Sequence, residues 1–264
     1  MILSSKTQFQ RCVSVTSEQQ FVANYKGLDL RSVYQPIFDN QNSVVGVEAL
    51  VRICNEKKQN IRPDLFFDSP DVSLEDKINV ERLSRVIHIR NFSNSKYRKL
   101  NLFLNVLPSA GEYFALEDLK DGLLSKRLRD LHIDNTQLVM EVVELDSRNE
   151  KCLQHAMNRL AQHGFNIAID DYGMQASTRE RVELLKPAII KIDRKLLLDY
   201  MDGDEQPILE GIKLAREFSA RIVVEGIETK EQHQAMKRLD IDMFQGYYLA
   251  TPKPIAPLQL EKIS

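Results

Sequence analysis

The sequence predicts an α/β fold, a modified (β/α)8 barrel of the TIM type, and three observations lead to this prediction. Short apolar, β-branched segments alternate with helical patterns along most of the 264 residues. Several of these segments are almost entirely apolar, which is typical of strands buried on both faces of a parallel sheet. Their count and the chain length favour a barrel. An open doubly wound sheet is the alternative, although no G-x-G-x-x-G motif follows the first strands.

The strands are expected where β-branched and aromatic residues cluster between turn-forming residues. In chain order these segments are "SVYQPIF" (32–38), "SVVGVEAL" (43–50), "LNLFLNV" (100–106), "QLVMEVVEL" (137–145), "FNIAID" (165–170), "AIIKID" (188–193), "RIVVEGI" (221–227) and "MFQGYYL" (243–249).

The segments between these strands carry helix signals. After "SLED", the side chains of Val80, Leu83 and Ile87 fall on one face at helical spacing. Other signals mark helix ends, namely capping boxes, a proline in the first turn and a glycine after the last turn. They are Ser147 with Glu150, Gly164, Pro207, and Thr229 with Gln232.

Composition narrows the class of protein. The formal net charge is -2 and 43% of the residues are hydrophobic, so neither duplex nucleic acid nor a membrane surface is an expected partner. No apolar run approaches the roughly 18 residues that span a bilayer. Cys12, Cys54 and Cys152 lie far apart, which argues against a disulfide framework. We therefore expect a soluble, cytoplasmic protein.

The chain has no low-complexity stretch or Gly/Ser linker. We expect a short N-terminal extension over residues 1–31, a standalone barrel domain over residues 32–256 and a C-terminal tail over residues 257–264. Within the extension, "TSEQQFVANY" is predicted to form a short helix across the barrel bottom. Regulation would then come through expression, oligomerisation or another protein.

Polar residues stand where nearly every predicted strand ends, and in such a barrel these ends form the active-site face. The residues are Glu48, Asn105, Glu141 with Glu144, Asp170 with Asp171, Lys191 with Asp193, Glu225 with Glu228, and Gln245. Several carboxylates at one mouth repel each other unless cations lie between them. The histidines show no ligand spacing, so oxygen ligands and a pair of divalent ions, Mg²⁺ or Mn²⁺, are predicted.

These fragments together resemble the EAL family, phosphodiesterases that act on the bacterial messenger cyclic di-GMP. The resemblance runs over about residues 32–256. It is carried by Glu48-Ala49-Leu50 and Arg52, then by "FLNVLPS", "MEVVE", "IDDYG", "IKID", "VEGIET" and "FQGYYLATPKP". It implies the same modified barrel, and an enzyme that hydrolyses cyclic di-GMP to linear pGpG.

The resemblance also assigns roles to residues. One metal would be held by Glu48, Asn105, Glu141 and Asp170, and the second by Asp170, Asp171 and Glu225. Lys191 would hold and polarise the attacking water near Gln245, so that the catalytic residues are Lys191, Glu225, Glu48 and Gln245. Substrate would contact Arg52, Gln35 and Leu50, while Glu144 and Glu228 would support loops.

Two stretches depart from the family pattern. The segment "DYGMQASTR" has Gln175 where the family has a second glycine, and glutamine lacks the conformational freedom of glycine. Ile53 replaces the tryptophan that usually follows Arg52. The alternative function is therefore an EAL-like domain with weak or no catalysis, acting as a cyclic di-GMP receptor or a protein-binding regulator. A homodimer and a regulatory protein are the further partners considered.

Overall fold

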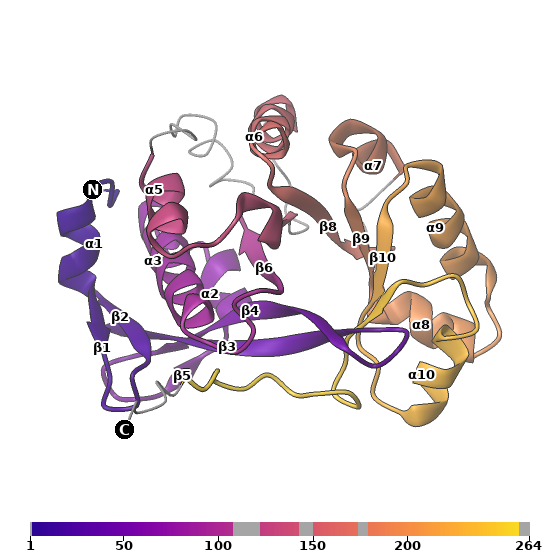
Figure 1. Ribbon diagram of the computed structural model, residues 1–264, viewed down its shortest axis with the longest axis horizontal. Helices are drawn as coiled ribbons and strands as arrows, with labels where there is room; N and C mark the ends of the chain where they lie inside the picture. The colour runs from indigo at the N-terminus through magenta and orange to yellow at the C-terminus, as the bar shows by residue number, and fades with distance from the viewer. Residues whose placement is uncertain (1, 108–121, 143–149, 174–178, 259–264) are drawn as a thin grey trace, which may run out of the picture.

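The computed structural model describes residues 2–107, 122–142, 150–173 and 179–258, and its strands form a closed barrel (Figure 1). The described strands belong to one sheet in the order β1-β2-β3-β11-β10-β9-β8-β7-β6-β4-β5. An additional pairing joins β3 to β4, so the strands from β3 round to β4 close on themselves. This confirms the predicted fold class.

Each of the expected barrel strands is present. They are β3 (Leu28–Asp39), β4 (Val44–Cys54), β6 (Asn101–Val106), β7 (Leu138–Val142), β8 (Asn166–Tyr172), β9 (Ile189–Ile192), β10 (Arg221–Val224) and β11 (Met243–Phe244). From β4 through β6 to β11 every neighbouring pair is parallel, whereas β3 runs antiparallel to both β4 and β11. The reversed β3 is the modification of the regular barrel.

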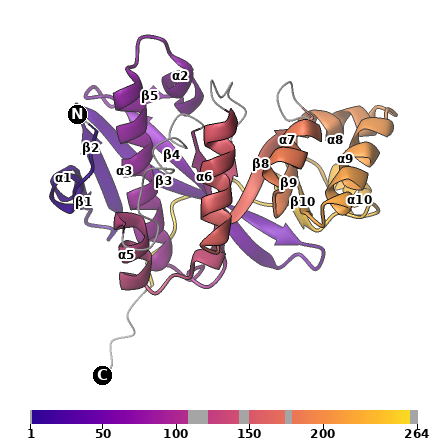
Figure 2. The ribbon, with the colours of Figure 1, turned by 90° about the horizontal axis from the view of Figure 1, so that it is seen from above.

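Helices cover the outside of the strands (Figures 1 and 2). They are α3 (Leu74–Ser93), α5 (Leu123–Asp130), α6 (Glu150–Gln162), α7 (Arg179–Leu185), α8 (Arg194–Met201), α9 (Gln206–Glu217) and α10 (Lys230–Met236). Pro207 lies in the first turn of α9, and Thr229 with Gln232 forms the capping box of α10, both as predicted. Ser147 lies outside the described residues.

The barrel interior is filled by a layer of apolar side chains, to which most strands contribute one residue. Its buried members are Ile37, Phe103, Val139, Ala168, Ile189, Val223 and Met243. A second, larger cluster lies between the strands and the helices that cover them. The strands are therefore buried on both faces, which explains their nearly continuous apolar sequences.

The N-terminal extension is a helix and two strands rather than the predicted helix over residues 16–25. That prediction is wrong, because Phe21–Tyr25 form β2, which pairs with β3, while the helix α1 spans Lys6–Cys12 and is followed by β1 (Val13–Val15). In β2, Ala23 and Tyr25 are buried with a period of two. The extension also does not cross the barrel bottom, since β2 pairs with the part of β3 that lies beside the C-terminal end of β4.

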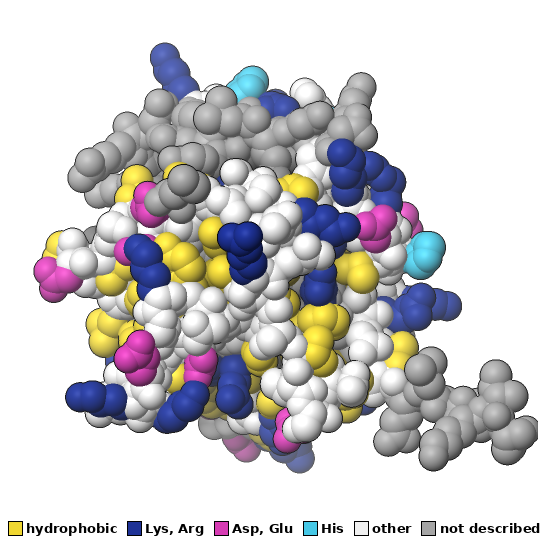
Figure 3. All heavy atoms as spheres, turned by 90° about the vertical axis from the view of Figure 1, so that its left-hand side faces the viewer, with side chains coloured by type: hydrophobic (Ala, Val, Ile, Leu, Met, Phe, Trp, Pro, Cys, Tyr) yellow, Lys and Arg dark blue, Asp and Glu magenta, His cyan; other side chains and the backbone are white. Residues whose placement is uncertain are grey.

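Two arginine side chains of α3 pack against aromatic rings of this extension. The Arg82 guanidinium lies 5.9 Å from the ring centre of Phe9, and that of Arg90 lies 4.9 Å from the ring centre of Phe21. Figure 3 shows the side of the molecule that carries α1, where Lys and Arg side chains are spread among hydrophobic ones. Next to this region, β5 (Asn60–Ile61) and α2 (Pro63–Asp68) follow β4.

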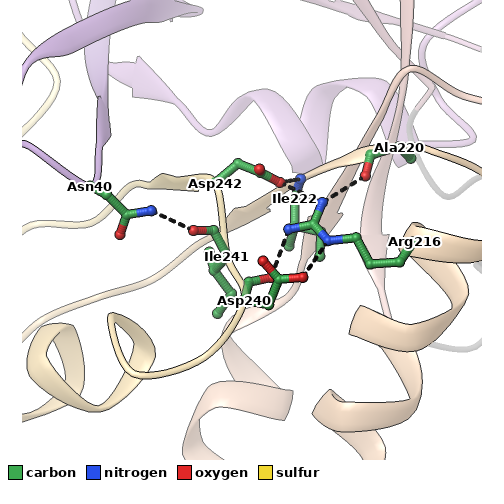
Figure 4. Close-up of polar contacts among 7 residues, drawn as sticks. All are labelled: Asn40, Arg216, Ala220, Ile222, Asp240, Ile241 and Asp242. Atoms are coloured by element: carbon green, nitrogen blue, oxygen red, sulfur yellow. Dashed lines mark hydrogen bonds and ion pairs between the residues drawn. The ribbon is translucent and has the colours of Figure 1, made fainter.

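At the N-terminal ends of the parallel strands, Arg216 at the end of α9 ties three segments together (Figure 4). Its guanidinium lies 2.7 Å from Asp240 and 2.9 Å from Asp242, and it donates to the carbonyl oxygens of Ala220 and Asp240. Asp242 in turn accepts a hydrogen bond from the backbone N–H of Ile222 at 2.7 Å. The start of β10 and the segment before β11 are thereby held at fixed positions relative to α9.

None of the helices in the described ranges combines the length and the apolar character needed to cross a membrane.

Candidate active site

The polar residues of the mouth form the next layer of inward-facing side chains above the apolar barrel layer. Because side chains alternate along a strand, residues two positions further point the same way. On the parallel strands that contribute to the apolar layer, the residue two positions after the apolar one is polar. The pairs are Phe103 and Asn105, Val139 and Glu141, Ala168 and Asp170, Ile189 and Lys191, Val223 and Glu225, and Met243 and Gln245. On the antiparallel β3 the same step runs backwards, from Ile37 to Gln35, which pairs with Glu48 of β4.

Lys191 occupies the centre of this layer. Its Nζ lies 2.6 Å from Glu225 Oε1, 2.7 Å from Glu141 Oε1 and 2.8 Å from Asp170 Oδ1. Glu48 Oε2 is further away, at 3.9 Å. The side chain of Lys191 is 1% exposed and that of Glu141 is fully buried, so water contributes little to their solvation. One ammonium group therefore faces several carboxylates in a place where charge is weakly screened.

The crowding changes the proton affinities of these groups. Burial raises the pKa of Glu141 and of Glu225 well above the usual value, although the Lys191 ammonium acts in the opposite direction. Burial alone would lower the pKa of Lys191, but the carboxylates around it, led by Asp170, raise it well above its usual value. The site therefore favours any additional positive charge.

Two neighbouring aspartates reach the same side of β8 because the strand is irregular at this point. The pairing of β8 with β9 shifts register between Ile169 and Tyr172, and Asp171 has a φ of 51°. Such a bulge turns one residue out of the regular alternation. As a result, one oxygen each from Asp170, Asp171 and Glu225 lie within 4.8 Å of one another. This carboxylate triad has the composition that a divalent cation with oxygen ligands requires.

Glu48 is held by amide groups from two other strands. Gln245 of the β11 segment donates to Glu48 Oε2 at 2.6 Å, and Asn105 donates to Glu48 Oε1 at 3.4 Å. Both oxygens of Glu48 are therefore oriented before any ligand binds. Glu141 differs, because its Oε2 is buried and has no hydrogen-bond partner among the described residues. An unpartnered buried carboxylate oxygen fits a metal ligand.

A pocket of about 370 Å³ opens beside these groups. Leu50 and Arg52 from β4, Asn105 and Asp171 line it on the barrel side. Pro63 and Phe67 from α2 line it on the other side. Pockets that hold small molecules usually measure roughly 300–1,000 Å³, so the volume suits a small molecule bound next to the carboxylates.

A buried polar stripe of α3 also lines this pocket, and sequence reasoning missed it. Its members are Glu81, Ser84, Arg85 and His88, which recur at the spacing of one helix face. Arg85 forms an ion pair with Glu81, and the Nδ1 atom of His88 lies 2.7 Å from Ser32 Oγ. The spacing of these polar residues is visible in the sequence. It did not indicate a pocket, because a polar helix face ordinarily faces water.

The remaining predicted site residues lie in different surroundings. Arg52 is on a strand and exposed, and it donates to the carbonyl oxygen of its neighbour Val51 at 3.1 Å. Gln35 is buried and donates to the Ala250 carbonyl oxygen at 3.2 Å, away from the pocket lining. Glu228 lies 2.5 Å from Arg194 in an exposed ion pair. Glu144, like the loop over residues 174–178, lies outside the described residues.

Comparisons with known proteins place the chain among proteins of one family. A family model described as EAL domain matches residues 19–252. The probable cyclic di-GMP phosphodiesterase PdeD of Escherichia coli (strain K12) is 27% identical over 234 residues, which are 84% of this chain and 41% of that protein. The EAL-domain containing protein YkuI of Bacillus subtilis (strain 168) is 30% identical over 236 residues, 85% of this chain and 55% of that protein.

A solved structure of the Bacillus subtilis YkuI protein, in complex with substrate c-di-GMP and calcium, has a similar fold. It matches with a TM-score of 0.72 and 27% identity, over 85% of this chain and 56% of that chain. The chain thus spans about two fifths of PdeD and little more than half of YkuI.

Proposed function

The chain belongs to the EAL domain family, and we propose that it hydrolyses cyclic di-GMP to the linear dinucleotide pGpG. The single observation that carries this proposal is the crowded carboxylate layer around Lys191, with a pocket at its side. Hydrolysis of a phosphodiester needs positive charge at the reacting phosphate, because both the substrate and its transition state are anionic. A site with excess carboxylate supplies that charge by binding divalent ions.

The residues present fit divalent ions. All side-chain donors of the layer except Lys191 are carboxylate or amide oxygens, which Mg²⁺ and Mn²⁺ prefer. We propose that Glu48, Asn105, Glu141 and Asp170 hold one ion and that Asp170, Asp171 and Glu225 hold the second. Bound there, the two ions would acidify a water molecule and neutralise charge that develops on the phosphate.

The protein side chains have separate tasks in this proposal. Lys191 holds and polarises the attacking water with its ammonium group, whose raised pKa keeps it protonated at neutral pH. Gln245 fixes the orientation of Glu48 through its 2.6 Å hydrogen bond. The water oxygen forms a new bond to phosphorus and the bond from that phosphorus to a ribose 3′-oxygen breaks. The water gives up a proton, the leaving 3′-oxygen takes up one to become a hydroxyl, and the ring of the dinucleotide opens to pGpG.

The pocket beside the layer is the proposed place of the nucleotide. Arg52 and Leu50 line it, and the guanidinium of Arg52 would bind a substrate phosphate. Gln35 donates to the Ala250 carbonyl oxygen instead, so for this residue we propose that it holds the segment after β11 against the mouth. Glu228 would steady the segment after Glu225 through Arg194.

Incubation of the purified protein with cyclic di-GMP and Mn²⁺, followed by chromatography of the nucleotides, tests the proposal. We expect pGpG to accumulate, and we expect none with the Asp170→Asn variant. Glu210→Gln is the matched control, because Glu210 is an exposed carboxylate on α9, and it should behave as the unaltered protein. Binding of cyclic di-GMP without turnover at any Mn²⁺ concentration would identify a receptor instead of an enzyme.

The proposed substrate is a bacterial internal messenger, so the proposal includes a cytoplasmic location. We further propose that the chain forms a homodimer. Light scattering of the purified protein measures its mass in solution, and a mass of one chain at all concentrations would contradict the dimer.

A further inference from the structure

The backbone that carries the carboxylate triad takes an unusual path. Asp171 has a φ of 51° and Gly173 a φ of 106°, so two of three successive residues are in the left-handed region. An aspartate in this region is uncommon and persists only when its surroundings hold it there. In a regular strand Asp170 and Asp171 would point to opposite faces. The left-handed conformation at Asp171 is therefore what allows both carboxylates to join Glu225.

The side chain between these two residues is held by a helix on the outside of the barrel. The ring of Tyr172 lies against α9 at Gly211, so closely that a methyl group on Gly211 would come within 2.9 Å of Tyr172 Cε1. Gly211 is buried in the middle of α9, where glycine is an unfavourable residue for a helix. The absence of a side chain at this position makes room for the ring.

Two further contacts fix the same segment. The carbonyl oxygen of Tyr172 accepts a hydrogen bond from the N–H of Asp193 at 3.2 Å. A methyl group on Gly173 would meet Leu196 Cδ1 at 2.6 Å, so α8 packs directly on this turn. These contacts involve Tyr172 and Gly173, the two residues that follow Asp171, and neither contact involves the Asp171 carboxylate. The segment is thus held through Tyr172 and Gly173.

We propose that Gly211 and Tyr172 form a positioning pair for the carboxylate triad. The ring of Tyr172 packs against the backbone of α9 at Gly211. This contact keeps Asp171 in its left-handed conformation, with its carboxylate beside those of Asp170 and Glu225. This inference rests on the proposed function only in that the triad binds a divalent ion. Neither residue of the pair touches that ion.

The test is the affinity for Mn²⁺ measured by titration calorimetry in the Gly211→Ala variant. Alanine favours the helix, whereas its contact with the ring opposes this gain, so α9 should persist and the melting temperature of the apo protein should change little. The added methyl group displaces the ring, so the affinity of the triad for Mn²⁺ should fall by about 10- to 100-fold, as for other residues that orient metal ligands. Lys213→Ala, at an exposed position of the same helix, is the control and should bind Mn²⁺ normally.

A second substitution separates positioning from general damage. Tyr172→Leu removes the ring and should also weaken Mn²⁺ binding. In the double variant, the methyl group at position 211 occupies space that the ring has vacated. Its loss of affinity should therefore be smaller than the product of the two single losses. If the loss of Mn²⁺ affinity in the double variant equals the product of the two single losses, the two residues act independently and the inference is wrong.

Titration of the unaltered protein with Mn²⁺ distinguishes a failure of the metal site from a failure of the positioning pair. If it binds no Mn²⁺ at the triad, the metal site proposed above is wrong and the inference fails with it. If it binds Mn²⁺ and Gly211→Ala binds equally tightly, the metal site stands and the positioning pair is refuted.

Discussion

Gln245 Nε2 lies 2.6 Å from Glu48 Oε2, although the two residues are 197 positions apart in the chain. Glu48 stands on β4 and Gln245 directly follows β11, the two strands that flank the reversed β3. The hydrogen bond therefore crosses the place where the barrel closes. It makes the geometry of Glu48 dependent on closure, and it links the beginning and the end of the barrel at the level of the carboxylates.

Substitution Glu48→Ala should abolish hydrolysis of cyclic di-GMP while the fold remains intact. The carboxylate lies at the mouth and contributes to the proposed metal site more than to the core. The measurements are the rate of pGpG formation and the far-UV circular dichroism spectrum. Gln245→Leu should have a weaker effect of the same kind, because Glu48 keeps its charge and loses only a hydrogen bond. Near-normal turnover of Glu48→Ala at limiting Mn²⁺ would contradict the assignment.

Substitution Asp171→Asn should eliminate hydrolysis and leave the apo protein equally or more stable. The change keeps the shape of the side chain and removes one negative charge from a crowded cluster. Mn²⁺ bound at the proposed site would stabilise the folded state, so the variant should also gain less in melting temperature across a Mn²⁺ titration. Full activity together with a much less stable apo protein would make Asp171 a structural residue.

Substitution Lys191→Met should destabilise the apo protein by about 3–5 kcal/mol, the usual cost of removing one partner from a buried ion pair. Glu141, Asp170 and Glu225 would then face one another without their central cation. Mn²⁺ should restore most of the lost stability while hydrolysis stays absent. Urea unfolding with and without Mn²⁺ measures both effects, and an apo protein of unchanged stability would argue against the central role of the ammonium group.

Stability should depend on pH through His88. Burial, with a smaller effect of Arg85, lowers the pKa of His88 to about 3 in the folded protein. The unfolded chain takes up a proton at this histidine below about pH 6.5, so stability falls as the pH drops from that value towards 3. Between pH 6.5 and 5, His88→Gln should lose about 2 kcal/mol less stability than the unaltered protein, as measured by urea unfolding. If both proteins lost the same stability between pH 6.5 and 5, His88 would take up its proton in the folded state as well, and the prediction would be wrong.

Substitution Arg216→Ala should destabilise the fold by about 1–2 kcal/mol through lost hydrogen bonds to Ala220 and Asp240, and little through charge, because the ion pair is partly exposed. Arg216→Lys keeps the charge but loses the planar fork, so it should be nearly as unstable. Thermal melting at low and high salt checks this. A large salt dependence would mean that charge is the main contribution.

The barrel could be predicted because its strands have unusual sequences. Segments such as "RIVVEGI" are apolar because they are buried on both faces, and their polar ends mark the mouth. The strand β2 was missed because its period of two extends over only five residues, Phe21–Tyr25, after a polar stretch that also suits a helix.

The site was only partly predictable for a different reason. The residue types at the strand ends indicated a cation site, but the contact of Lys191 with Glu141, Asp170 and Glu225 depends on the register of β7 to β10, which the sequence does not specify. The polar stripe from Glu81 to His88 was hidden because its spacing equals that of a solvent-facing helix surface. Only the placement of α3 beside the mouth shows that this stripe is buried.

The reversed direction of β3 also provides a site for attaching a label far from the mouth. Since β3 runs against its neighbours, the tight turn from Asp39 to Ser43 projects from the end of the barrel opposite the mouth. The side chains of Gln41 and Asn42 are exposed there, while Asn40 is bound to the Ile241 carbonyl. A fluorophore or a surface tether attached at Gln41 would therefore label or immobilise the molecule at the end opposite the mouth, leaving the carboxylate layer accessible.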